Sequence, residues 1–297
     1  MNRRNFIENT GILAFSALLP LPTYSMIGKN KYKMGLQLYS IHQEMIKDTI
    51  ATLKAVKAMG YEDFETFGFD SEKGTYYGYK AVEFKKILED LQITTNSGHY
   101  GFSSYLTKSD DDLKRFVDQC IIGAHALDMK YIVWPWIAPE QRTMDDFKIM
   151  SKKLNIIGEQ VTASGIGFAY HNHGFEFIDH GGENGFDIIL RETDPSLVKL
   201  QMDMYWVMNS SKYTPKELIS KQPGRYVMWH LKDMDKVTRD YTELGNGSID
   251  YVKLLPNPVD SGLKYYYLEQ GGNYAHSSMQ SVADSASYFK KHLQRYL

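Results

Sequence analysis

The sequence predicts a single-domain (β/α)8 barrel, an α/β fold of the TIM-barrel class. Short β-favouring runs alternate with longer segments of helical apolar spacing from Lys33 onward, at intervals of about thirty residues. Eight such runs can be counted, which is the number of strands that closes this barrel. No low-complexity linker interrupts the series, and a chain with 43% hydrophobic residues can bury one sizeable core.

The predicted strands are, in order, residues 34–39, 63–67, 93–98, 131–134, 166–171, 198–203, 226–231 and 265–269. Helices are expected between or after them, for example at 46–59, 81–91, 144–164 and 278–297. Residues 70–79 and 233–248 are expected to be long strand-to-helix loops that cover an active site. The barrel is expected to occupy residues 32–297.

Residues 1–25 have the pattern of an export signal. Arg3 and Arg4 precede Phe6 and an uncharged stretch that is apolar at 11–21. This pattern is similar to a twin-arginine signal, which implies export of a folded protein across the bacterial inner membrane. A general secretory signal or an N-terminal anchor is the alternative. The apolar run is short for a transmembrane helix, so we expect cleavage, a periplasmic product and no stable membrane insertion.

The charges nearly balance, with 34 basic and 36 acidic residues. No basic run stands out, which argues against a nucleic-acid partner and favours a small neutral or weakly charged one. The single cysteine, Cys120, lies in a helix-like run, where a buried structural thiol is expected. The oligomeric state stays open.

Two histidines lie at the end of the fifth predicted strand. Residues 165–177 read GIGFAYHNHGFEF, and His171 and His173 share a strand face because they are two residues apart. Glu176 follows as the chain leaves the strand. This segment alone favours hydrogen-bonded rim histidines over a binding site.

The other strand ends change that interpretation. Polar residues gather where a TIM barrel has its active site, namely Gln37, Glu65, His99, His171, His173, Asp203, His230, Lys232 and Glu269. Four of them come from consecutive strands, and one shared divalent ion would satisfy all four: His171, Asp203, His230 and Glu269. Two nitrogens and two carboxylates suit Mn, Co, Zn or Fe better than Ca.

Aromatic residues also follow the strands: Trp134, Trp136, Tyr205 and Trp206. They suggest a platform for a sugar ring, with Trp134 and Trp206 as substrate contacts. Packing at the barrel rim explains them equally well.

From about Met34 to its C-terminus the chain resembles the xylose-isomerase-like TIM barrels of the sugar phosphate isomerase/epimerase family. The phrases that carry the resemblance are GLQLYS, YHNHGFEF, MDMYW, HLKD and YLEQ. The resemblance implies one divalent ion bound by residues from strands five to eight, which places the ligands at His171, Asp203, His230 and Glu269. His171 stands where the family usually has a glutamate, which argues against a two-glutamate epimerase mechanism. Trp206 stands where many relatives have a substrate-contacting histidine.

DNA-repair endonucleases belong to the same superfamily. The fourth strand end reads VWPW at 133–136 and has no histidine, and the chain has no basic surface. Both features disfavour an endonuclease.

The function expected from the sequence is a metal-dependent sugar isomerase or epimerase that abstracts a proton and stabilises an enediolate. Glu269 is the expected base, and His173 is its partner acid or base with Glu176 behind it. Lys232 would donate to the enolate oxygen. Gln37, Glu65 and His99 would position substrate hydroxyls.

Two alternatives remain. A lyase that eliminates from a 3-keto-glycoside or related keto-sugar shares the first chemical step, and an exported enzyme is expected to act on an unphosphorylated sugar. A non-catalytic sugar-binding barrel would use the aromatic platform without a metal.

Overall fold

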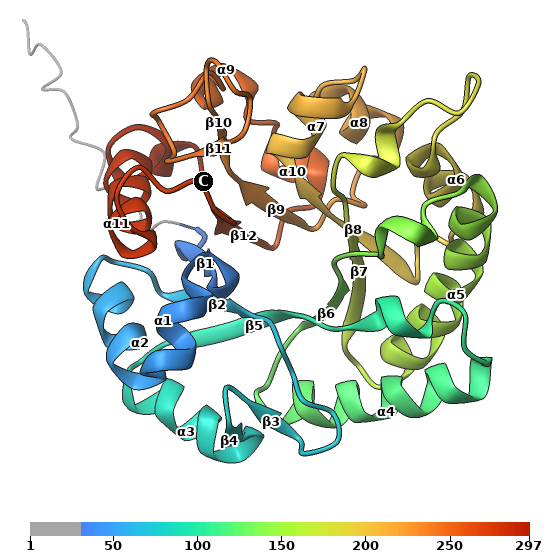
Figure 1. Ribbon diagram of the computed structural model, residues 1–297, viewed down its shortest axis with the longest axis horizontal. Helices are drawn as coiled ribbons and strands as arrows, with labels where there is room; N and C mark the ends of the chain where they lie inside the picture. Colours follow the sequence, from blue (N-terminus) through green and yellow to red (C-terminus); the bar gives the residue numbers. More distant parts are fainter. Residues whose placement is uncertain (1–30) are drawn as a thin grey trace, which may run out of the picture.

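The computed structural model describes residues 31–297, which form a closed barrel of parallel strands surrounded by helices (Figure 1). Neighbouring strands follow the order β1, β2, β5, β6, β7, β8, β9 and β12, and β12 pairs again with β1. The signal expected at 1–25 lies outside the described residues. None of the helices within 31–297 is long and apolar enough to cross a membrane.

All eight predicted strands are confirmed, with ends that differ by a few residues. The barrel strands are β1 (Gly35–Gln37), β2 (Asp63–Thr66), β5 (Thr94–His99), β6 (Tyr131–Trp134), β7 (Gly167–His171), β8 (Val198–Asp203), β9 (Met228–Leu231) and β12 (Tyr265–Leu268). Helices cover their outer faces, so most strand residues are buried on both sides of the sheet. This explains the short apolar runs without strict alternation.

The helices are α1 (His42–Lys47), α2 (Thr49–Ala58), α3 (Ala81–Asp90), α4 (Asp110–Ala126), α5 (Met144–Ala163), α6 (Gly185–Glu192), α7 (Met204–Ser210), α8 (Pro215–Lys221), α9 (Tyr251–Leu254), α10 (Pro258–Ser261) and α11 (Ser278–Tyr288). The first predicted helix, 46–59, is divided in two. Asp48 has extended backbone angles, and its carboxylate caps α2 by accepting the Ala51 N–H at 3.0 Å. An aspartate in this position favours a new helix start over continuation.

The two long loops contain short antiparallel hairpins, β3 (Thr75–Tyr76) with β4 (Tyr79–Lys80) and β10 (Asp233–Met234) with β11 (Tyr241–Thr242). The second hairpin matters for the site because it follows β9 directly. The buried carboxylate of Asp233 accepts four backbone N–H groups in this loop, from residues 234, 245, 247 and 249. One side chain therefore holds the loop over the barrel mouth.

The core has two parts. The large cluster lies between the strands and the helices, and Cys120 of α4 is buried in it, as expected for a structural thiol. A small separate cluster consists of Val133, Ala169, Val227, Met228 and Tyr267. Four of these lie on β6, β7, β9 and β12, so we place this cluster inside the barrel, where strands of this fold interdigitate their side chains.

Candidate functional site

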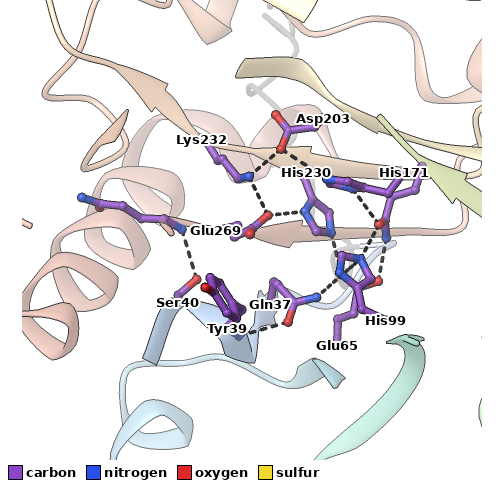
Figure 2. Close-up of polar contacts among 12 residues, drawn as sticks. Gln37, Tyr39, Ser40, Glu65, His99, His171, Asp203, His230, Lys232 and Glu269 are labelled. Atoms are coloured by element: carbon purple, nitrogen blue, oxygen red, sulfur yellow. Dashed lines mark hydrogen bonds and ion pairs between the residues drawn. The ribbon is translucent and has the colours of Figure 1, made fainter. Parts of the chain in front are cut away.

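Four side chains from adjacent strands converge at the carboxyl ends of β7, β8, β9 and β12. His171, Asp203, His230 and Glu269 each offer one ligand atom, and these atoms all lie within 4.8 Å of one another (Figure 2). His171, Asp203 and His230 are fully buried or nearly so. The structure thus brings together the four residues for which the sequence suggested a shared divalent ion. Ligand atoms of His99, His171 and His230 also lie within 4.8 Å of one another.

The two histidines of this group are oriented as metal-binding histidines are. His230 Nε2 lies 2.6 Å from Glu65 Oε2, and His171 Nδ1 lies 2.9 Å from Gln201 Oε1. Their other nitrogens face the group: His230 Nδ1 lies 2.5 Å from Glu269 Oε2, and His171 Nε2 lies 3.7 Å from Asp203 Oδ2. A metal-bound imidazole usually has its second nitrogen hydrogen-bonded in this way.

Glu65 supports the group from beneath. Its carboxylate accepts hydrogen bonds at 2.6 Å from three side chains, Gln37, Ser97 and Gln201, besides its contact with His230. Glu65 and Gln37 have no exposed surface and do not line the cavity above the site. The expectation that they position substrate hydroxyls stays a prediction. In this structure both contact protein side chains.

His230 is positively charged in this arrangement. Burial by itself lowers the pKa of His230, but the carboxylates of Glu65 and Glu269 raise it to about 9. Burial likewise raises the pKa of Glu65, yet the imidazoles of His99 and His230 hold it well below its usual range. A divalent ion would take the place of the proton on the His230 nitrogen that faces the group.

Lys232 joins the two carboxylates of the group. Its Nζ lies 2.7 Å from Asp203 Oδ2 and 2.9 Å from Glu269 Oε2, and the residue is 3% exposed. Burial lowers the pKa of Lys232, but the two carboxylates more than offset this and keep the amine protonated. Asp203 Oδ2 has this ionic partner but no well-aligned hydrogen bond.

His173 lies just beyond the end of β7, with its ring 4.9 Å from that of His171. Its ring stacks on Phe175 and lines the cavity, and its Nδ1 is buried without a hydrogen-bond partner. Burial and the nearby Lys232 lower the pKa of His173 to about 3, so the ring is neutral near pH 7. It is a free imidazole beside the four-residue group.

Glu176 does not reach the cavity. Its carboxylate accepts the backbone N–H of His173 at 2.9 Å and the hydroxyl of Tyr170 at 2.7 Å, and it has no exposed surface. The structure places this carboxylate behind His173, as expected, and a catalytic role of Glu176 stays a prediction. Its contacts hold the short turn that presents the His173 ring.

The cavity above the group has a volume of about 900 Å³. Its floor is polar and includes His99, His171, His173, Lys232 and Glu269, and its walls carry Tyr39, Phe67, Trp136, Phe175, Trp206 and Tyr241. Cavities of roughly 300–1,000 Å³ with few polar groups are typical of small-molecule sites.

Trp206 lines this cavity as expected, but Trp134 does not. Trp134 is fully buried, stacks on Phe102 and donates its indole N–H to the Trp136 carbonyl oxygen at 2.9 Å. Its neighbour Val133 belongs to the small cluster inside the barrel, so strand alternation turns Trp134 outward. Trp136 forms the cavity wall instead.

Sequence reasoning missed Gln201. Its amide oxygen lies 2.8 Å from His99 Nε2 and 2.9 Å from His171 Nδ1, and its NH₂ group donates to Glu65. It lies two residues before Asp203 on β8, and so on the same strand face. That spacing is the signal that could have identified it.

Comparison with known proteins agrees with this architecture. The family model for the xylose isomerase-like TIM barrel matches residues 53–262. The chain has no significant match among curated protein sequences.

Solved structures give the same fold. Two are structures of a sugar phosphate isomerase/epimerase, both from Parabacteroides distasonis ATCC 8503. One is 24% identical with a TM-score of 0.76, covering 93% of this chain and 99% of that one. The other is 27% identical with a TM-score of 0.72, covering 89% of this chain and 99% of that one. A third, the IOLI protein with a bound zinc atom, is 14% identical with a TM-score of 0.64 and coverage of 89% and 99%. By its fold and the extent of the family match, this chain belongs to the xylose isomerase-like TIM barrel family.

Proposed function

We propose that this protein is a metal-dependent sugar isomerase or epimerase that removes a proton next to a carbonyl or hydroxyl of a sugar or keto-sugar. The observation that carries the proposal is the group of two imidazoles and two carboxylates on the floor of a cavity with aromatic walls. The donor set suits Mn, Co, Zn or Fe. A divalent ion held there would supply a Lewis acid that polarises the substrate oxygen.

The four candidate ligands fit an ion after a small closure. Two donors about 2.1 Å from one ion are at most about 4.2 Å apart, whereas the four atoms here lie within 4.8 Å. A movement of roughly half an ångström brings them into range. The contacts from Glu65 to His230 and from Gln201 to His171 fix the two rings for that role.

Glu269 is the proposed base because it is the one carboxylate of the group on the cavity floor. Burial raises the pKa of Glu269, but Lys232 and His230 more than offset this and lower it well below its usual range. The carboxylate is therefore ionised and weakly basic while both cations contact it. Its use as a base requires that one of them moves away.

His173 is the proposed partner that returns the proton. Its neutral ring lines the cavity, and Glu176 holds its backbone in place. An imidazole is most effective as a general acid or base when its pKa lies near the working pH, so this role requires that the pKa of His173 rises from about 3, as it would if Lys232 moved away. His99 also lines the cavity and can bind a substrate hydroxyl, and Trp206 and Trp136 offer apolar faces to a sugar ring.

A lyase that eliminates from a keto-glycoside is the second candidate. One observation favours it: the cavity floor presents a single carboxylate, Glu269, and His171 stands where the family resemblance implies a second glutamate. Elimination needs only one strong base, whereas epimerisation usually needs two opposed ones. We also propose that the mature protein is periplasmic, from the arginine pair and the apolar run at 11–21.

Metal analysis combined with incubation in deuterated water tests the proposal. The metal-loaded protein is incubated with a panel of free sugars, keto-sugars and keto-glycosides, and mass spectrometry follows deuterium at carbon. An isomerase or epimerase incorporates deuterium into a rearranged sugar, and Glu269→Gln abolishes it. A lyase releases the aglycone. Sugar binding that persists in EDTA without deuterium incorporation would instead identify a binding protein.

A further inference from the structure

The candidate metal centre already contains a cation of its own. The ammonium of Lys232 lies between Asp203 and Glu269, as Figure 2 shows. Its Nζ is 2.7 Å from an oxygen of Asp203 and 2.9 Å from an oxygen of Glu269. These are the only two carboxylates among the four candidate ligands. A divalent ion bound by all four would therefore need the carboxylates that Lys232 now neutralises.

The Lys232 ammonium and a divalent ion would compete for the carboxylates of Asp203 and Glu269. In the part of the chain that the structure describes, the ionisable groups that act on Lys232 Nζ are these two carboxylates and the Tyr241 phenol. The imidazoles of His171 and His173 are close enough for Lys232 to lower their pKa, and His230 with Glu65 lies beyond Glu269. Adding a divalent ion while the ammonium stays in place would put two cations side by side in a buried site. Like charges at that distance repel strongly where water is excluded.

The Lys232 side chain lines the cavity and can move within it. Its backbone is held on both sides by Tyr251, whose hydroxyl accepts the Lys232 N–H at 3.2 Å and donates to its carbonyl oxygen at 2.5 Å. The flexible stem, by contrast, borders the cavity. The ring of Tyr241 lies 5.6 Å from Nζ on the cavity wall and can receive an ammonium on its face.

We infer that Lys232 is an internal counter-ion of the metal centre: it holds Asp203 and Glu269 together without metal, and a divalent ion displaces its ammonium toward Tyr241 and the cavity. The inference rests on the proposed metal-dependent function and deepens it. It assigns Lys232 a role in setting metal affinity, and it describes how Glu269 loses one of its two cationic partners.

Metal titration tests this directly. Binding of Zn²⁺ and Mn²⁺ to the purified, chelator-treated protein is measured by calorimetry for the wild type, Lys232→Met and Lys232→Gln. Both variants should bind metal at least about tenfold more tightly than the wild type, because each removes a cation that occupies the two carboxylates and repels the ion. Lys153→Met is the matched control, because Lys153 is also buried and contacts the carboxylate of Asp110 far from the centre. It should bind metal like the wild type.

A crystal structure of the wild type with Zn²⁺ gives a second measurement that does not depend on a variant. Lys232 Nζ should have left both carboxylates in that structure. Equal or weaker metal binding by both Lys232 variants, no metal binding by any of the proteins, or an ammonium that still contacts both carboxylates beside the ion would overturn the inference. Failure of deuterium exchange with tight metal binding intact would refute the proposed reaction and leave the counter-ion role standing.

Discussion

His171 and His173 should divide the work of ligand and catalyst, although both rings line the same cavity. His171 is one of the four converging side chains, and its Nδ1 is fixed by Gln201 at 2.9 Å. His173 lies beyond the strand, outside that group, with an unpartnered Nδ1. The perturbation is therefore a pair of single substitutions, His171→Ala and His173→Ala.

The expected magnitudes follow from these positions. Loss of a residue that only orients a ligand costs about 10–100-fold in metal affinity, so removal of the ligand His171 itself should cost more than about 100-fold. His171→Ala should thus lose metal and activity together. His173→Ala should keep the metal affinity of the wild type and lower turnover by roughly 100-fold or more, the scale of a lost general acid or base.

The assay combines metal content after dialysis, calorimetric metal titration and the rate of deuterium incorporation. His125→Ala, an exposed histidine on α4, serves as the control for loss of an imidazole far from the site. Equal loss of metal in the His171 and His173 variants would refute the division and make His173 a further ligand. Normal turnover in His173→Ala would remove it from the reaction.

Three further predictions concern the supporting residues and the N-terminus. Glu65→Gln should destabilise the fold by about 3 kcal/mol and weaken metal binding, because it removes one of the two carboxylates that contact the buried His230. Urea unfolding at neutral pH and metal titration would measure both effects, and unchanged values would contradict the prediction. Burial raises the pKa of Glu176 from its ordinary 4.5 to about 7, so the native state holds this proton more tightly than the unfolded chain and stability falls as the pH rises between these values. Glu176→Gln should abolish this pH dependence, so its effect on the free energy of unfolding should be more favourable at pH 8 than at pH 4, by up to about 3 kcal/mol. Equal effects of the substitution on the free energy of unfolding at the two pH values would argue against this. Replacing Arg3 and Arg4 by lysines should retain the precursor in the cytoplasm, as fractionation would reveal; normal export would point to a general secretory signal instead.

Some features of this protein were determined by local sequence patterns. The eight strands were predictable because β-favouring runs and helical apolar spacing alternate along the chain, and strand ends in a barrel meet at one rim. The four candidate metal ligands followed from that rule, since each is the polar residue at a strand end or just past it. Because β7, β8, β9 and β12 are adjacent parallel strands, their carboxyl ends bring these four side chains together.

The roles of individual polar residues depended on contacts between distant segments. Glu65 and His230 are 165 positions apart, and only closure of the barrel puts a carboxylate of β2 against an imidazole of β9. The position of Lys232 depends in the same way on Asp203 and Glu269 from two other strands.

Local patterns also failed where side-chain direction decided the outcome. Trp134 and Trp136 look alike in sequence, yet Trp134 is the last residue of β6 and packs in the core, whereas Trp136 lies past the end of the strand and lines the cavity. Glu176 folds back onto its own turn instead of facing the cavity. A strand-end rule places residues at the barrel rim because it rests on backbone geometry, but which way each side chain turns is set by packing and hydrogen bonds that form only in the folded protein.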